Sequence, residues 1–315
     1  MNSDSPLVSV VCVTYNHGPY IAEAIESFLQ QETDFPFEII IGEDFSTDET
    51  REICLEYAKK YPDKIHLAIS DGNVGARNNY FRALSAARGK YIAFCEGDDY
   101  WSDPKKLAIQ IGYMEKHPEC SLTFHSVRII NGDKATNKTI RPFNKKTIIP
   151  KNTFFGYGTM APSPTLVYPR KYIIDPPDWL RHSPVGDIPL KLYLSQLGTV
   201  VYLDKIMAMR RIGVEGSWSK RMQTFSYRQK LFPGMIVMLE GFNEFSKYIY
   251  AYQVLKKQLS YEIKSVKNPI TKVRQMLKLI RTKYSKSYSS LSLTKKMFAI
   301  GNLFITSIVE QVARR

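Results

Sequence analysis

The chain has 315 residues, of which 44% are hydrophobic and 23% are charged. This balance excludes a disordered or low-complexity protein. The net charge of +14 is concentrated in the last third: residues 1–210 carry 24 Lys/Arg against 25 Asp/Glu, whereas residues 211–315 carry 20 against 5. We expect no signal peptide, because no basic stretch precedes the first apolar run, and no membrane-spanning helix, because no run reaches about 18 apolar residues. Four cysteines without metal-type spacing indicate reduced thiols in a cytosolic protein.

The first 117 residues alternate between strand-like and helix-like segments. Short apolar, β-branched runs predict buried strands, and apolar residues at helical spacing predict helices. The predicted strands are residues 7–16, 37–42, 64–70 and 90–95, and the predicted helices are residues 18–31, 46–61, 73–89 and 102–117. This alternation predicts an α/β fold with a parallel sheet and helices on its faces.

Beyond residue 120 the pattern is less regular. Residues 121–130 and 165–174 resemble strands, 186–198 a short helix, and 200–213 a strand pair or meander. Helical patterns dominate from about residue 225. We therefore place a domain boundary near residue 220, where the neutral part of the chain meets the basic part.

Polar and acidic residues follow each of the four predicted strands at the point where it ends. They are Thr14-Tyr15-Asn16, Glu43-Asp44, Asp71-Gly72-Asn73 and Glu96-Gly97-Asp98-Asp99. The carboxyl ends of parallel strands meet at one edge of the sheet, where such sheets bind ligands. The sequence therefore predicts a polar site at this edge.

The stretch CEGDDYW places three carboxylates within four positions. Like charges this close repel and raise one another's pKa unless a cation lies among them. The adjacent Asp98 and Asp99 suit a hard divalent cation such as Mg²⁺ or Mn²⁺, which keeps coordination positions open for phosphate oxygens. The alternative is a solvated turn, but the three other polar strand ends favour a metal site.

Four stretches resemble family 2 glycosyltransferases of the GT-A fold in their order and spacing: VSVVCVTYN, EIIIGEDFSTDET, NVGARN and GKYIAFCEGDDYW. The resemblance covers the first 125 residues. It implies a Rossmann-like fold with a mostly parallel central sheet, a nucleotide-sugar donor carrying UDP, and Mn²⁺ or Mg²⁺. On this basis residues 1–220 form the catalytic domain, with a nucleotide-binding half (1–125) and an acceptor half (126–220). Residues 221–315 form a helical, basic C-terminal region.

The resemblance also assigns roles to individual residues. Asp99 matches the metal-binding aspartate, and Asp98 matches its neighbour, which lies toward the ribose and diphosphate and is a second candidate metal ligand. The remaining donor-binding matches are Asp44 for the base, most often uracil, Thr14 and Tyr15 for the first nucleotide-binding loop, and Arg77 near the base. Glu96 stands where many members have Asp, and its role is left open.

An inverting transfer needs a general base for the acceptor hydroxyl. The family places it in an ED-like motif that opens a helix, and PVGDIPLKLYL is the best match, with Asp187 as the base and Gly186 in place of Glu. The alternative for Asp187 is a simple helix N-cap. In MRRIGVEGSWSK, the resemblance suggests Arg210 and Arg211 for the donor diphosphate and Trp218 for the acceptor; the alternative is a surface loop.

The Q-x-x-R-W motif of processive synthases is absent, which favours addition of a single sugar to a saccharide or lipid-linked saccharide acceptor in cell-surface glycan synthesis. Residues 241–315 carry 15 Lys/Arg against 3 Asp/Glu, interleaved with apolar residues. This pattern predicts a helix on an anionic membrane surface, and so a peripheral protein on the inner face of the plasma membrane. A helical bundle packed on the catalytic domain and a dimerisation element are the alternatives.

The sequence disfavours three other functions. A basic nucleic-acid-binding protein is disfavoured because no known nucleic-acid-binding motif occurs, so we expect no nucleic-acid partner. A nucleotidyltransferase would carry a glycine-rich, basic phosphate loop after the first strand, where this chain has VTYNHGPY. A catalytically silent relative is disfavoured by the presence of Asp98, Asp99 and Asp187.

Overall fold

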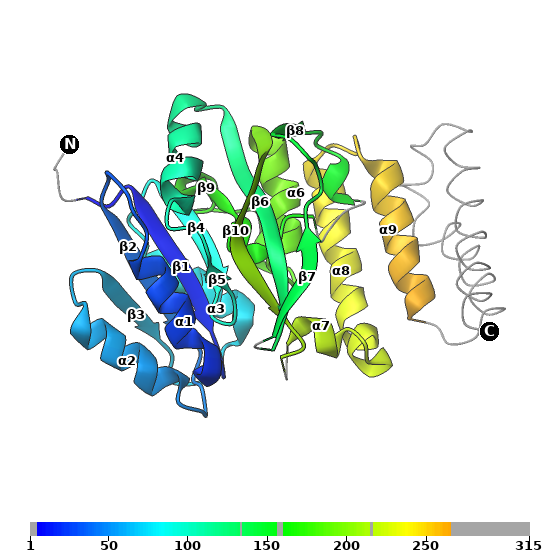
Figure 1. Cartoon of the computed structure of the whole chain (residues 1–315). Coiled ribbons are helices and arrows are strands. Elements are labelled where there is room, and N and C mark those ends of the chain that lie inside the picture. Colours follow the sequence, from blue (N-terminus) through cyan, green and yellow to red (C-terminus); the bar gives the residue numbers. More distant parts are fainter. Residues whose placement is uncertain (1–4, 133, 156–159, 215–216, 266–315) are drawn as a thin grey trace. The chain divides into compact units, whose positions relative to one another are not determined.

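The computed structural model describes residues 5–132, 134–155, 160–214 and 217–265 (Figure 1). The chain divides into two compact units. The first comprises residues 1–176 and 186–217, and the second comprises residues 177–185 and 218–315. The short segment 177–185 therefore belongs with the C-terminal helices, although it lies far from them in the sequence.

The first unit is built on one sheet, and the predicted α/β fold is confirmed. Its helices are α1 (Gly18–Leu29), α2 (Thr50–Lys60), α3 (Gly75–Ala86), α4 (Lys106–Lys116) and α6 (Asp187–Leu197), with 3₁₀ turns η1 (Thr153–Phe155), η2 (Ser163–Thr165) and η3 (Arg170–Tyr172). Its strands are β1 (Val8–Thr14), β2 (Phe37–Glu43), β3 (Ile65–Ile69), β4 (Tyr91–Glu96), β5 (Tyr100–Trp101), β6 (Cys120–Asn131), β7 (Lys134–Ile140), β8 (Thr147–Ile149), β9 (Val167–Pro169) and β10 (Thr199–Ile212).

The strand order is β3-β2-β1-β4-β9-β6-β10-β5, with β7 paired to β6 and β8 paired to β10. The first four strands are parallel, as are β6 and β10, whereas β9 runs antiparallel to both β4 and β6. In this register Thr14 pairs with Glu43 and Val13 pairs with Glu96. The polar ends of β1, β2 and β4 therefore meet at one edge, as the alternation predicts.

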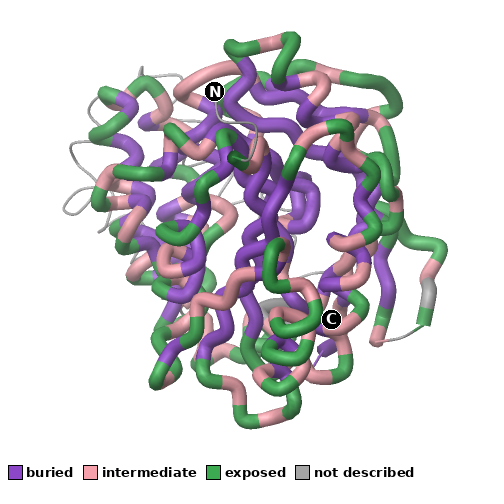
Figure 2. The backbone as a smooth tube through the Cα atoms, turned by 90° about the vertical axis from the view of Figure 1, so that its left-hand side faces the viewer, coloured by how far each residue is buried: buried purple, intermediate pink, exposed green. Residues whose placement is uncertain are grey.

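The core lies between the sheet and the helices that cover it. On one face, Val10 and Cys12 of β1 join a buried cluster with Ile25 of α1, Cys54 of α2 and Ile111 of α4. Figure 1 shows α1 and α2 on the near face of β1 to β3 and α3 behind them. Figure 2 shows long buried stretches of backbone, with exposed residues both in the turns and along the helices. Strands buried on both faces explain the nearly continuous apolar runs in the sequence.

The second half of the sheet departs from the prediction. Residues 200–213 do not form a strand pair: β10 is one long strand with register shifts between Leu203 and Ala208. These irregularities leave Asp204 out of the ladder, and it forms an ion pair with Arg141 instead. The predicted strand 165–174 is only three residues long, because Pro169 is followed by the turn η3. The sequence analysis did not predict β7 or β8.

The second unit is helical in its described part, which ends at residue 265. It contains α5 (Asp178–Arg181), α7 (Trp218–Arg221), α8 (Phe225–Phe245) and α9 (Ala251–Lys264). Trp179 packs edge-on against Phe242 at 5.5 Å between ring centroids, and Gly241 leaves the space that the Trp179 side chain needs. Among the described residues, no helix combines the length and apolar character needed to cross a bilayer. Most of the basic stretch that predicts membrane binding lies outside the described residues.

Lys106 is a buried cation in the core of the first unit. Its Nζ lies 4.0 Å from the centroid of the Trp101 ring and makes no hydrogen bond to any described residue. Burial lowers the pKa of the Lys106 ammonium to about 7, although Cys95 acts in the opposite direction. Between about pH 7 and the usual lysine value of about 10.4, the unfolded chain holds a proton that the folded chain lacks, so this group makes stability rise with pH.

We expect Lys106→Met to be more stable than the wild type at pH 7 by about 1–4 kcal/mol, because an apolar side chain removes the cost of a buried charge. The gain should shrink as the pH rises toward 10. The free energy of unfolding from urea titrations at pH 7 and pH 9.5 measures both effects, with exposed Lys105→Met as the matched control. A variant less stable than the wild type at pH 7 would show that the ammonium is well compensated where it lies.

Candidate active site

Three carboxylates gather where β4 ends and the loop to β5 begins. Glu96, Asp98 and Asp99 each offer one carboxylate oxygen, and these oxygens lie within 4.8 Å of one another. Asp99 is only 3% exposed. Oxygen ligands at this spacing fit a hard divalent cation of the Mg²⁺ or Mn²⁺ type.

The electrostatics of this acidic cluster favour a bound cation. Burial, with the nearby Asp98 and Glu96 carboxylates, raises the pKa of Asp99 well above its usual value. Burial, followed by Asp98 and Asp187, raises the pKa of Glu96 to about 7, although Arg210 and the Ser163 hydroxyl act in the opposite direction. A positive charge among such carboxyl groups stabilises their ionised form and offsets their mutual repulsion.

Gly97 holds the acidic loop against the end of β1. A Cβ at position 97 would lie 2.7 Å from Thr14 Oγ1 and 2.9 Å from Thr14 Cβ, which is closer than any side chain tolerates. The Gly97 N–H donates to the Val13 carbonyl at 2.9 Å. Only glycine allows this approach, so the loop brings Glu96 and Asp98 beside Thr14.

Two adjacent arginines of β10 have different roles. The Arg211 N–H donates to Asp99 Oδ1 at 2.7 Å, and its guanidinium donates to the Asp98 carbonyl at 3.0 Å and to Glu23 at 2.6 Å. The Arg211 side chain is therefore a clamp on the acidic loop. The charge of Arg210 lowers the pKa of the Glu96 and Asp99 carboxyl groups, and contact of either arginine with a donor diphosphate stays a prediction.

Asp44 organises the start of α3. Its two carboxylate oxygens accept hydrogen bonds from the Val74 and Gly75 N–H groups, each at 2.9 Å, and it is 1% exposed. The structure thus places Asp44 at the carboxyl end of β2, where its carboxylate binds the N-terminus of α3. At the same edge, Tyr15 is 42% exposed and Thr14 is buried. A contact between Asp44 and a base stays a prediction.

Asp187 is the first residue of α6. Gly186 is the residue before the helix, and among the described residues no side-chain hydrogen bond caps this end. The N-cap alternative for Asp187 is therefore wrong. Asp187 lies close enough to Glu96 to raise its pKa. Arg77 lies over the Phe81 ring at 4.5 Å, and a Cβ at position 186 would be 3.8 Å from its Nη1. Arg77 therefore reaches the start of α6.

The sequence analysis missed two residues that belong to this site. The Ser163 hydroxyl lies close enough to the Glu96 carboxyl group to lower its pKa, and Lys191 Nζ lies 2.8 Å from Asp187 Oδ2. The sequence does contain a signal for Lys191. It lies four positions after Asp187 and is the one charged residue in the stretch IPLKLYLSQL. Ser163 left no comparable signal, because it sits between two prolines in an irregular segment.

Trp218 begins α7, and its side chain lies outside the described part of the structure. Its predicted role toward the acceptor is therefore not addressed.

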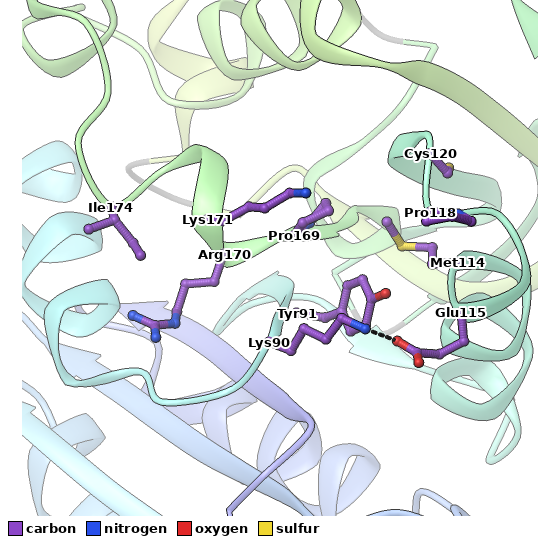
Figure 3. Close-up of a pocket in the computed structure, with 10 residues that line it drawn as sticks. All are labelled: Lys90, Tyr91, Met114, Glu115, Pro118, Cys120, Pro169, Arg170, Lys171 and Ile174. Carbon is purple, nitrogen blue, oxygen red and sulfur yellow. Dashed lines mark hydrogen bonds and ion pairs between the residues drawn. The ribbon is translucent and has the colours of Figure 1, made fainter. Parts of the chain in front are cut away.

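A cavity of about 220 Å³ lies away from this cluster (Figure 3). It is formed at the opposite, amino-terminal end of β4, where Lys90 pairs with Glu115 at 2.7 Å. Tyr91, Met114 and Cys120 supply apolar lining. Because Tyr91 is the first residue of β4 and Glu96 the last, this cavity is separated from the acidic cluster by the length of the strand and is not part of it.

Comparisons with known proteins agree with this geometry. The family model described as "Glycosyl transferase family 2" matches residues 9–173. An uncharacterized protein of Mycobacterium tuberculosis is 36% identical over 215 residues, which cover 67% of this chain and 60% of the relative. The Escherichia coli UDP-Glc:alpha-D-GlcNAc-diphosphoundecaprenol beta-1,3-glucosyltransferase WfgD is 33% identical over 170 residues, covering 53% of this chain and 64% of that enzyme. The chain thus spans less than two thirds of the length of these relatives.

Among solved structures, residues 1–349 of Staphylococcus aureus TarS in complex with UDP-GlcNAc superpose with a TM-score of 0.55. The match covers 98% of this chain and 91% of the TarS chain, at 17% sequence identity. At that identity the likeness establishes a shared fold, the GT-A fold that the sequence predicts.

Proposed function

The chain belongs to glycosyl transferase family 2, and from that premise we propose that it moves a single sugar from a nucleotide-sugar donor, UDP-linked, to a saccharide or lipid-linked saccharide in cell-surface glycan synthesis. The observation that carries this proposal is the cluster of Glu96, Asp98 and Asp99 at the carboxyl edge of the sheet. The name of WfgD, which acts on a diphosphoundecaprenol-linked sugar, supports the acceptor class.

The acidic cluster would hold Mn²⁺ or Mg²⁺, with Asp98 and Asp99 as the principal ligands and Glu96 beside them. When bound, such an ion supplies neutralisation of the charge on a leaving diphosphate. The chain's own residues prepare the site for it: the Arg211 N–H fixes one oxygen of Asp99, and Gly97 lets the loop approach β1. Thr14, Tyr15, Asp44 and Arg77 would bind the nucleoside half of the donor.

Asp187 would act as the general base of an inverting transfer. The acceptor oxygen forms a bond to the anomeric carbon while its proton passes to the Asp187 carboxylate. The bond between that carbon and the donor diphosphate breaks, and its electron pair leaves with the diphosphate. Asp187 is 34% exposed and near Glu96, so an acceptor hydroxyl can reach it beside the donor site.

The proposed organisation has three parts. Residues 1–125 bind the nucleotide, 126–220 bind the acceptor, and 221–315 form a basic region that docks on an anionic membrane surface. The charge of 15 Lys/Arg against 3 Asp/Glu in residues 241–315 supports docking, because each Lys or Arg near an anionic leaflet contributes about 1 kcal/mol. The protein would then work at the inner face of the plasma membrane, where lipid-linked acceptors are accessible.

A thermal-shift panel tests the proposed function. We expect UDP-glucose or UDP-GlcNAc to raise the melting temperature only when Mn²⁺ or Mg²⁺ is present, because ligands that bind the native state stabilise it by about 2.7 kcal/mol at 100 times Kd. GDP-mannose serves as the control for the base, and EDTA for the metal. A panel in which no nucleotide sugar stabilises the protein with metal would contradict the proposal, and pyrophosphate release from UTP with a sugar 1-phosphate would indicate a nucleotidyltransferase.

A further inference from the structure

Lys191 is a buried cation in the middle of α6. Its side chain is 1% exposed, and the helix around it is apolar and buried, with Leu190, Leu192 and Leu194 beside it. Removing an ammonium group from water costs several kcal/mol unless close partners compensate it. A core position that needed only packing would be filled by leucine or methionine, so the partners of Lys191 explain its presence.

Asp187 and Ala161 are partners of the ammonium among the described residues. Lys191 Nζ donates to Asp187 Oδ2 at 2.8 Å and to the Ala161 carbonyl at 3.0 Å. Lys191 lies one helical turn after Asp187, and helical side chains point toward the helix N-terminus, so the Lys191 side chain can reach the Asp187 carboxylate. The buried ammonium therefore holds one oxygen of a carboxylate whose side chain remains 34% exposed.

The second contact connects Asp187 to β4, the strand that ends at the acidic cluster. Ala161 lies two residues before the turn η2, and Leu166, directly after η2, accepts a hydrogen bond from the Phe94 N–H of β4 at 3.1 Å. Lys191 is thus hydrogen-bonded both to the candidate base and to the segment that pairs with β4. One buried group sets the position of Asp187 relative to the end of β4.

We propose that Lys191 is the positioning residue for the general base: it holds Asp187 Oδ2, so that Oδ1 is the oxygen presented to the acceptor hydroxyl, and it balances the negative charge that Asp187 adds beside the acidic cluster. This inference rests on the proposed function. It adds that the base is oriented from inside the helix, by a residue that touches neither donor nor acceptor. Misplacing a reacting group by about 1 Å can cost about 100-fold in rate.

The test compares Lys191→Met and Lys191→Arg with the wild-type protein. Transfer is followed as UDP release from UDP-glucose or UDP-GlcNAc with Mn²⁺, with water as the acceptor when no saccharide is supplied. We expect Lys191→Met to lower kcat about 10- to 100-fold while the Kd for the donor stays within about twofold. Lys191→Arg keeps a cation beside Asp187 and should recover part of the lost kcat. Equal losses in both variants would assign the effect to packing and overturn the inference.

A double-mutant cycle separates positioning from a purely structural role. If Lys191 acts through Asp187, adding Lys191→Met to Asp187→Asn should cause no further loss of kcat. A multiplicative loss in the double variant would overturn the inference. If Lys191→Met fails to fold, Lys191→Gln keeps a hydrogen-bond donor without the charge and takes its place in the cycle.

The outcomes distinguish this inference from the proposed function. A wild-type protein that neither binds nor cleaves a nucleotide sugar contradicts the proposed function itself. A wild-type protein that releases UDP, loses activity with Asp187→Asn and is indifferent to Lys191→Met retains the proposed function and contradicts only the role of Lys191.

Discussion

Asp99→Asn is expected to abolish the metal-dependent stabilisation of the protein by a nucleotide sugar. An amide is a poor ligand for a hard divalent cation compared with a carboxylate. Losing one charged partner of a buried ion pair costs about 3–5 kcal/mol, which corresponds to a weakening of more than about 100-fold. Thermal shift and calorimetry with UDP-GlcNAc and Mn²⁺ measure the loss.

The same substitution should make the metal-free protein more stable. Burial and the neighbouring Asp98 and Glu96 raise the pKa of Asp99 in the folded state. At neutral pH the unfolded chain therefore ionises this group more readily than the folded chain, and that difference opposes folding. Asparagine removes the difference and still accepts the hydrogen bond from the Arg211 N–H through its amide oxygen.

A matched control separates the metal effect from a general change of charge. Asp63→Asn makes the same chemical change at an exposed position just before β3, at the opposite edge of the sheet, and should alter neither property. If Asp99→Asn kept full metal-dependent donor binding, Asp99 would not be a metal ligand and the proposed site would have to move.

Local patterns predicted the first half of the fold because each element there obeys one periodicity. In α1, Ile21, Ala24, Ile25 and Phe28 are all buried, which is the face that helical spacing indicates. Alternation with helices predicts that β1 to β4 are parallel, so that their carboxyl ends share one edge. The position of β4 beside β1, which brings Glu96 to the end of β1, is seen only in the structure. Strand direction alone therefore predicts the shared acidic edge, whereas the neighbours along that edge depend on the sheet order.

The second half depends on contacts that no local pattern contains. β10 is irregular between Leu203 and Ala208, where Asp204 leaves the ladder and pairs with Arg141, 63 residues away. The segment 177–185 belongs with α8 because Trp179 fits beside Gly241. Both are contacts between residues far apart in the chain, and a single sequence does not indicate which residues pair in this way.

The two arginines of β10 show the same limit within the site. Adjacent strand residues point to opposite faces, so the two side chains have different partners. The sequence does not indicate that Arg211 bonds Glu23 in α1, because the two residues lie far apart in the chain. The residue types at the edge were predictable from the sequence. The different contacts of the adjacent residues Arg210 and Arg211 were not, because they depend on the three-dimensional fold.

Asp187→Asn is expected to lower the rate of transfer at least about 100-fold while donor binding is unchanged. A positioned general base contributes about 10²- to 10⁴-fold, and asparagine cannot accept the acceptor's proton. Asparagine matches aspartate in size and is well tolerated near a helix start, so the fold should persist. The kcat for UDP release and the Kd for the donor, measured with Mn²⁺ on the same preparation, check both parts.

Asp178→Asn is the matched control, because Asp178 also opens a helix, α5, but is 94% exposed. If Asp187 did no more than favour a helix N-terminus, both variants would lose a few tenths of a kcal/mol of stability and both would keep full activity. The contacts argue otherwise: a buried ammonium holds Asp187 from one side, and its other neighbour is the acidic cluster. A carboxylate that is held in a fixed position and is still partly exposed to solvent can serve as a proton acceptor. If Asp187→Asn retained full transfer activity, the general base would be another residue.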